Sequence, residues 1–410
     1  MFPRFVATKP LDLSNLPKSG MVSRTVSVRQ LVRMIHQSGR WVGIVTSGGG
    51  GAAPAWLLEV PGASRSIAEV VIPYHPSAFT AFLGFRPEQF CSPAAARALA
   101  VTAFLRVRKL VGPQELCVGV GCTASLVSDR PKRGPHRVHV AYQTADTTAW
   151  FHVEFTKGIR PRVAEDHLAS RLILWAIAEA CELPARPAMP LRPEETVNHR
   201  LKKAPHEWSE VFLGQRPFAL ASGFLPETSW NQLAIFPGSF APFHEGHQKM
   251  ASLAKELLGR PVVLEVSLAN ADKPPLDFLT LEERMNTIPA DCPVLITRAP
   301  TFAEKVEIFP GATFIVGADT LLRIADPRFY GGSREAMLQA ITKIAQRGCR
   351  FLVFGRKVAD QFLTLSQMCL PPELREICQE VPESIFRADI SATAIRQALQ
   401  GQEEATSSED

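Results

Sequence analysis

The chain has 410 residues, of which 46% are hydrophobic and 21% charged, as expected for a globular protein long enough for two or three domains. Its net charge of +5 is small for this length, which argues against a nucleic-acid-binding protein, and no apolar run is long enough to span a membrane. Eight cysteines are scattered without a C-x-x-C pair, which favours reduced thiols in a cytoplasmic protein.

Residues 1–25 are predicted to form an N-terminal extension. They contain few acidic residues, as transit peptides do, but Pro3, Pro10 and Pro17 argue against a long amphipathic helix. A targeting segment and a plain extension both stay open as interpretations.

Residues 26–183 alternate helical and strand patterns and predict a separate α/β domain. The first strand ends in four glycines, residues 48–51, which would let a ligand approach the backbone closely and would equally suit a flexible loop. Helical patterns lie at 28–36, 92–110 and 164–181, and strand patterns lie at 41–45, 70–72, 117–120, 137–142 and 150–155.

The order of these elements, with Val60-Pro61-Gly62-Ala63-Ser64 eight residues after the glycines, resembles the CinA-type nicotinamide-nucleotide amidase domain. The resemblance covers nearly all of residues 26–183 and implies that fold. The family's second loop corresponds to residues 123–128, which lack its glycine and its Gly-Pro pair.

The resemblance places the family's nucleophilic serine at Ser47, its tyrosine at Tyr74 and its catalytic lysine at Phe79. A serine hydroxyl is a weak nucleophile without a neighbouring base, and phenylalanine cannot accept a proton. We therefore expect a vestigial amidase site. The domain would then act as a scaffold, a ligand sensor or the surface of a homo-oligomer.

Residues 184–230 are predicted to be a linker. Prolines recur at every third position from Pro184 to Pro193, and basic residues lie among and after them, which is typical of a semi-rigid, partly extended segment. The basic side chains would either attract a nucleotide or an acidic partner or simply be solvated, and charge patterning favours solvation.

Strand and helical patterns alternate again over residues 231–400 and predict a Rossmann-like parallel sheet with helices on both faces. Ligands of such sheets bind at the carboxyl ends of the strands. Strand patterns lie at 233–236, 262–268, 293–297, 313–316 and 351–354, and helical patterns lie at 246–258, 280–288, 334–347, 371–379 and 392–399. Residues 401–410 form an acidic tail that is predicted to be disordered.

The loop after the first of these strands reads Gly238-Ser239-Phe240-Ala241-Pro242-Phe243-His244-Glu245-Gly246-His247. A strand, a small-residue loop and a helix N-terminus together suit phosphate binding, because backbone N–H groups and the helix dipole point at the anion. The two histidines are three residues apart and would project to one side of the first helical turn. A zinc site would need a third or fourth Cys or His nearby, so we predict no protein-held metal.

Seven fixed positions of this loop match the G-S-F-x-P-x-H-x-G-H signature, so it resembles the adenylyl- and cytidylyltransferases. The resemblance implies nucleotidyl transfer from ATP, with Mg²⁺ on the triphosphate. It implies that His244 and His247 are catalytic. It also implies ATP or phosphate contacts from four loop residues, Gly238, Ser239, Phe240 and Gly246.

Two further motifs follow later strands. Lys273 occupies the place of a family lysine that reaches the phosphates, and a solvated loop lysine is an equal alternative. Gly317-Ala318-Asp319-Thr320 resembles the G-A-D of the nicotinate/nicotinamide mononucleotide branch. This implies nucleotide or acceptor contacts from Gly317, Asp319 and Thr320, while helix capping by Asp319 is the structural alternative.

The segment from Ile390 to Arg396 resembles the family's I-S-S-T-x-I-R. The resemblance implies that Ser391 and Thr393 bind the phosphates and that Arg396 is a catalytic residue with a fixed charge for phosphate oxygens.

The leading hypothesis is transfer of the adenylyl group of ATP to a phosphorylated small-molecule acceptor, with nicotinamide or nicotinic acid mononucleotide favoured. The alternatives are an adenylyl- or cytidylyltransferase with another acceptor, such as phosphopantetheine, and a non-catalytic nucleotide sensor. Relatives often stack the pyridine ring on a tryptophan after G-A-D, but all six tryptophans here precede residue 231. Phe329 and Tyr330 are the aromatic candidates for that role, and both are equally candidates for the core.

Overall fold

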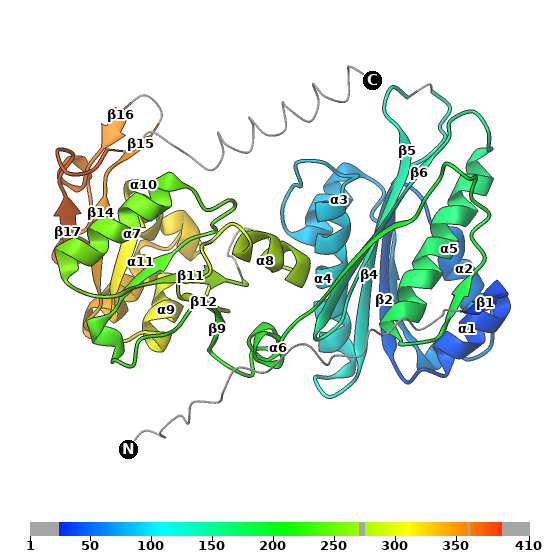
Figure 1. The fold of residues 1–410 in the computed structure, drawn as a ribbon, viewed down its shortest axis with the longest axis horizontal. Helices are drawn as coiled ribbons and strands as arrows, with labels where there is room; N and C mark the ends of the chain where they lie inside the picture. Colours follow the sequence, from blue (N-terminus) through cyan, green and yellow to red (C-terminus); the bar gives the residue numbers. More distant parts are fainter. Residues whose placement is uncertain (1–23, 131, 270–274, 359–360, 388–410) are drawn as a thin grey trace.

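The computed structural model describes residues 24–130, 132–269, 275–358 and 361–387. Two large sheets organise them, a six-stranded sheet and a seven-stranded sheet (Figure 1). We call residues 24–203 the N-terminal unit and residues 218–387 the C-terminal unit. Within the described ranges, no helix is long and apolar enough to cross a membrane.

The N-terminal unit is a mixed sheet covered by helices. Its elements are β1 (Arg24–Val26), α1 (Val28–His36), β2 (Trp41–Ser47), α2 (Ala52–Glu59), β3 (Ile67–Val71), α3 (Pro76–Leu83), α4 (Pro93–Val111), β4 (Cys117–Ser125), β5 (His136–Gln143), β6 (Thr147–Phe155), α5 (Arg162–Ala180), β7 (Ala185–Pro187) and β8 (Asn198–Lys203). The sheet has the order β3-β2-β4-β5-β6-β8, parallel from β3 to β4 and antiparallel from β4 onward.

Helices α4 and α5 lie on opposite faces of this sheet (Figure 1). The α4 helix passes so close to β4 that a Cβ atom at Gly119 or Gly121 would lie 2.2 Å from helix backbone atoms. The strand predicted at 117–120 therefore continues to Ser125, because Gly121 serves close helix–sheet packing inside the strand.

Residues 184–230, predicted to be a semi-rigid, partly extended linker, contribute a strand to each of the two large sheets. β7 pairs in parallel with β1, and β8 adds an antiparallel edge strand to β6. A helix, α6 (His206–Leu213), and the strand β9 (Phe218–Ser222) follow, and β9 is already part of the second sheet. The basic residues are not simply solvated, since Arg200 and Lys202 pair with Glu283 and Glu282 of the C-terminal unit.

The C-terminal unit confirms the predicted parallel sheet. Its further elements are β10 (Ala234–Pro237), α7 (Glu245–Leu258), β11 (Val262–Ser267), α8 (Phe278–Met285), β12 (Val294–Thr297), α9 (Phe302–Ile308), β13 (Thr313–Gly317), α10 (Ala318–Ile324), α11 (Arg334–Gln346), β14 (Arg350–Phe354), β15 (Arg356–Val358), β16 (Gln361–Leu363), α12 (Pro372–Arg375) and β17 (Cys378–Val381). The sheet order is β17-β14-β13-β10-β11-β12-β9, in which only β9 pairs antiparallel.

The helix predicted at 371–379 is only partly present. The four-residue α12 ends at Arg375, and Cys378–Val381 form the edge strand β17 beside β14. The helix predicted at 392–399 lies outside the described residues.

One apolar core joins the two units. The rings of Phe104 in α4 and Phe212 in α6 are 5.7 Å apart, and those of Phe212 and Phe278 in α8 are 5.2 Å apart. The same cluster of buried side chains reaches Phe236 and Phe240 in the C-terminal sheet and its first loop. The two units therefore pack as parts of one core.

Candidate functional site

The candidate site lies where the winding of the C-terminal sheet reverses. β10 is flanked by β11 on one side and by β13 on the other, and all three strands are parallel. The chain segments that leave β10 and β13 therefore emerge at the same edge of the sheet, at the switch point where ligands of doubly wound sheets bind. His244 and His247 follow β10, while Gly317 is the last residue of β13 and Asp319 follows it.

Phe240 anchors the loop after β10. Its backbone is in the left-handed region at φ 41°, and its side chain is fully buried against Phe236 and His247, at ring distances of 5.5 and 5.1 Å. A Cβ atom at Gly238 would lie 2.5 Å from this ring, so the position requires glycine. The Phe240 side chain therefore packs the loop, and a phosphate contact at this residue would come from its backbone.

The two histidines form a stacked pair at the start of α7. Their ring centroids are 3.7 Å apart at an interplanar angle of 25°, and a Cβ atom at Gly246 would lie 3.1 Å from the His244 ring. The backbone N–H of His244 donates to Nδ1 of His247 at 3.3 Å. This bond leaves the proton of a neutral His247 on Nε2, where it is available to a ligand.

Both histidines are held neutral. Burial lowers the pKa of His247 to about 3, and repulsion from Arg356 and from the protonated form of His244 adds to the effect. Burial also lowers the pKa of His244, again with a contribution from Arg356. The ring nitrogens of His244 are buried, and neither has a hydrogen-bond partner among the described residues. Because buried polar groups are normally paired, His244 is poised for a ligand.

Arg356 belongs to this site, although the sequence analysis did not select it. It begins β15, two residues after the end of β14, and its Nη1 lies 3.5 Å from Asp319 Oδ1. The sequence could have pointed to Arg356, because β14 is the parallel neighbour of β13 and its carboxyl end must reach the same edge of the sheet.

The N-cap of α10 is Gly317, so the alternative that Asp319 caps this helix is wrong. Asp319 lies in the first helical turn with the half-buried Thr320.

A second residue that sequence reasoning missed is Thr287, just after α8. Its Oγ1 accepts a hydrogen bond from the backbone N–H of Phe243 at 3.0 Å, and the Phe243 ring stacks on His247 at 5.5 Å. No local pattern marks Thr287, because α8 meets the histidine loop only in three dimensions.

The structure brings together only part of the predicted site. Ser239 is exposed in the histidine loop, near the pair of histidines in the chain. Four predicted phosphate-binding residues lie outside the described residues: Lys273, Ser391, Thr393 and Arg396. In the part of the chain that the structure describes, no group of three or more His, Cys, Asp or Glu side chains could hold a metal ion.

The three residues of the expected vestigial amidase site each have a contact partner outside the set. Ser47 Oγ donates to the backbone oxygen of Pro73 at 3.1 Å, and the hydroxyl of Tyr74 accepts from Arg162 at 3.4 Å. Phe79 is 1% exposed and packs edge-on against Phe90 at 5.3 Å. A lysine at position 79 would therefore lie in the core.

Carboxylates of α5 occupy the backbone donors of both amidase-like loops. Oδ1 of Asp166 accepts from the N–H groups of Gly50 and Gly51 at 2.8 and 3.2 Å, and Oδ2 accepts from Ala52 at 3.2 Å. Glu165 Oε2 accepts from the N–H of Val127 at 2.8 Å. The chain thus supplies its own anions to the backbone donors of these two loops.

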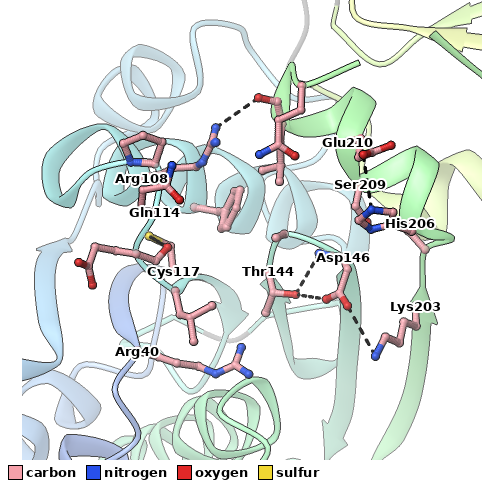
Figure 2. Close-up of a pocket in the computed structure, with 18 of the residues that line it drawn as sticks. Arg40, Arg108, Gln114, Cys117, Thr144, Asp146, Lys203, His206, Ser209 and Glu210 are labelled. Atoms are coloured by element: carbon pink, nitrogen blue, oxygen red, sulfur yellow. Dashed lines mark hydrogen bonds and ion pairs between the residues drawn. The ribbon is translucent and has the colours of Figure 1, made fainter. Parts of the chain in front are cut away.

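A cavity of about 570 Å³ lies between the end of α4, the turn after β5 and helix α6 (Figure 2). Its walls carry ion pairs of the chain itself, Arg40 with Glu182 at 2.7 Å and Lys203 with Asp146 at 3.6 Å. No residue of the histidine loop or of the segment after β13 lines this cavity. Its paired charges do not indicate a particular ligand.

Residues 235–398 match the cytidylyltransferase-like family model. No curated protein matches the chain.

Two solved structures that resemble part of the chain are competence- or damage-related proteins. The competence/damage inducible protein CihA from Agrobacterium tumefaciens is 19% identical with a TM-score of 0.31, and the match covers 38% of this chain and 99% of that chain. A competence-damaged protein (CinA) superfamily protein from Enterobacter cloacae is 14% identical with a TM-score of 0.29, and that match covers 44% of this chain and 98% of that chain.

The family match includes the strand, the histidine loop, the segment after β13 and Arg356. Residues 235–398 are therefore a cytidylyltransferase-like domain of the nucleotidyltransferase superfamily.

Proposed function

We propose that the C-terminal unit transfers the adenylyl group of ATP to a phosphorylated small molecule and releases pyrophosphate. The observation that carries this proposal is the stacked, neutral pair of His244 and His247 at the switch point of a cytidylyltransferase-like domain.

The chemistry needs positioning more than proton transfer. An oxygen of the acceptor phosphate bonds to the α-phosphorus of ATP while the bond to the pyrophosphate oxygen breaks, and the electron pair leaves with pyrophosphate. The acceptor phosphate is mostly ionised near neutral pH, since its second pKa is about 6, so a general base is not required. The substrate is ATP with its Mg²⁺ ion.

The two histidines suit the role of neutral donors to this triphosphate. Their N–H groups are fixed before the reaction and can stabilise charge that develops on the phosphate oxygens. Because burial keeps the pKa of His247 near 3, its donor does not depend on pH across the physiological range. Arg356 adds a positive charge at the same edge of the sheet, and Arg396 is proposed to add another.

We propose a pyridine mononucleotide as the acceptor. Gly317-Ala318-Asp319 resembles the motif of that branch, and it lies beside the histidine loop. Of the two aromatic candidates for ring stacking, Tyr330 donates its hydroxyl to the backbone oxygen of Ile324 at 3.1 Å, which favours a structural role. Phe329, whose ring lies 5.2 Å from the Arg323 guanidinium carbon, is the better candidate.

The test is release of pyrophosphate from MgATP by the full chain with a panel of acceptors. The panel contains nicotinamide mononucleotide, nicotinic acid mononucleotide, phosphopantetheine and a phosphorylated alcohol. We expect a dinucleotide with one of the first two. Rapid transfer to phosphopantetheine alone would show that the acceptor is not a pyridine mononucleotide. ATP binding without turnover would favour a non-catalytic nucleotide sensor.

His247→Ala should lower kcat by about a hundred- to a thousand-fold, which is typical for removal of one preorganised donor. His206→Ala, on the exposed side of α6, is the matched control and should keep wild-type turnover. Arg356→Met should raise the KM for MgATP because it removes a charge-assisted phosphate contact. Wild-type turnover by the His247 variant would refute the assignment.

A further inference from the structure

Helix α8 of the C-terminal unit lies at the boundary with the N-terminal unit, next to α4 (Figure 1). Its N-terminal end is fixed by a buried arginine of that unit. Arg97 Nε donates to Asp277 Oδ2 at 3.2 Å, and Arg97 Nη2 donates to Thr280 Oγ1 at 3.2 Å. Arg97 and Asp277 are 7% and 6% exposed, so this ion pair is shielded from water. Asp277 is also the N-cap of α8, with Oδ1 accepting from the N–H of Thr280 at 2.9 Å.

Other contacts of the N-terminal unit hold the same helix. The N–H of Phe278 donates to Thr148 Oγ1 at 3.0 Å, and Thr148 in turn donates to Gln143 at 2.5 Å. The Phe278 ring enters the shared core beside Phe212. On the outer side of the helix, Glu282 and Glu283 pair with two basic residues of β8, at 2.8 and 3.0 Å. The N-terminal unit therefore fixes both the position and the rotation of α8.

The other end of α8 holds the histidine loop. Thr287 Oγ1 donates to the backbone oxygen of Arg284 at 2.8 Å and accepts from the backbone N–H of Phe243 at 3.0 Å. Phe243 directly precedes His244, and its ring lies 5.5 Å from that of His247 at an interplanar angle of 28°. A continuous series of hydrogen bonds and ring contacts thus connects Arg97, through α8, to the two histidines.

We propose that the N-terminal unit positions the histidine loop through α8, with Arg97 and Thr287 as positioning residues for nucleotidyl transfer. The proposal rests on the proposed function of the C-terminal unit. Misplacement of a catalytic group by about 1 Å can cost about a hundred-fold in rate. A helix that is tied at both ends transmits a shift of its first turn to Phe243. The N-terminal unit would thus serve the reaction without binding its substrates.

The first test changes Arg97. Arg97→Ala should lower kcat for pyrophosphate release by about ten- to a hundred-fold, and Arg97→Lys should restore part of it, because a lysine keeps the charge but not the fork of donors. Arg106→Ala is the matched control. It removes an arginine of the same helix, and its carboxylate partner, Glu69, lies within the N-terminal unit.

The second test changes the far end of α8, where no buried charge is disturbed. Thr287→Val removes the acceptor for the Phe243 N–H at an exposed position, and Thr342→Val on α11 is its control. Hydrogen–deuterium exchange of peptides that cover residues 240–247 should rise in Arg97→Ala and Thr287→Val and stay unchanged in both controls. This readout does not depend on turnover.

The two kinds of failure are distinguishable. If the wild-type chain releases no pyrophosphate with any acceptor, the proposed function fails, while the exchange measurement still tests the link through α8. If the wild-type chain is active but Arg97→Ala and Thr287→Val keep its kcat and its exchange pattern, the positioning role is overturned. Faster exchange together with lower kcat in both variants, at temperatures well below their unfolding, supports it.

Discussion

His139 is a buried residue of β5 whose protonation affects stability. It is 4% exposed, stacks on His152 at 4.4 Å, and neither of its ring nitrogens has a hydrogen-bond partner in the described ranges. Burial lowers its pKa to about 3, with His152 and Arg137 adding to the effect. In the unfolded chain its pKa is about 6.5. The unfolded state therefore binds a proton between these two values while the folded state does not, so stability falls as the pH drops below 6.5.

His139→Phe keeps a ring in the stack and removes this proton. Between pH 6.5 and 4.5 the wild-type chain should lose about 2–3 kcal/mol more unfolding free energy than the variant. His247 has a similarly lowered pKa and is present in both the wild-type chain and the variant. Its contribution to the pH dependence of stability therefore cancels in the comparison. The measurement is urea unfolding at several pH values. Parallel stability curves would show that His139 does not titrate in this window.

At the residue scale, the sequence pointed to those parts of the candidate site that lie in one contiguous motif. The spacing of His244 and His247 correctly suggested that they project to one side of a helix start, because three residues make nearly one turn. Arg356 and Thr287 were missed because they reach the loop from other elements of the fold. The neutral state of the histidines was also not predictable, since it depends on burial and on Arg356.

At the scale of elements, the contact between α5 and the first glycine loop contributes to the stability of the N-terminal unit. Three backbone N–H groups at the start of α2 share the carboxylate of Asp166. Asp166→Ala removes this cap and should lower the unfolding free energy by about 1–2 kcal/mol, as removal of a helix cap does. Asp129→Ala, which changes an exposed carboxylate of the same unit, should lower it by much less. Equal urea midpoints for the two variants would contradict the capping role.

The same arrangement bears on amidase chemistry. We expect no ammonia release from nicotinamide mononucleotide by the full chain or by Asp166→Ala, because freeing the loop donors does not supply a proton acceptor. Phe79→Lys should unfold the domain rather than create activity, since it would bury an ammonium group among apolar side chains. A rate comparable with that of an active amidase would show that the unit is catalytic.

Most strands and long helices were predictable, because apolar runs and helical spacing mark them. The misses have identifiable causes. The proline spacing from Pro184 to Pro193 suggested a linker, but β8 follows it and is stabilised by pairing with β6, which is a non-local interaction. The end of the predicted helix at 371–379 overlaps the start of the edge strand β17, because pairing of β17 with β14 overrides a weak helical pattern.

At the scale of the whole molecule, the two units share a core that neither can complete alone. Val101 and Phe104 of α4 pack in one cluster with Phe212 of α6 and with Phe278 and Leu281 of α8. A fragment that contains either unit by itself would expose these side chains to water. When one unit unfolds, the other loses the stabilising free energy of their interface. The unfolding transitions of the two units are therefore coupled.

We therefore expect the full chain to unfold in one calorimetric transition, with the van't Hoff enthalpy close to the calorimetric enthalpy. Phe278→Ala removes a fully buried ring from the shared core and should lower the unfolding free energy by about 3–5 kcal/mol. Phe151→Ala, inside the N-terminal core alone, is the informative comparison. If the two units are coupled, Phe151→Ala lowers the midpoint temperature of the single transition. The reason is that the C-terminal unit loses its partner when the N-terminal unit unfolds. Two separate peaks, with Phe151→Ala moving only one of them, would show that the units unfold independently.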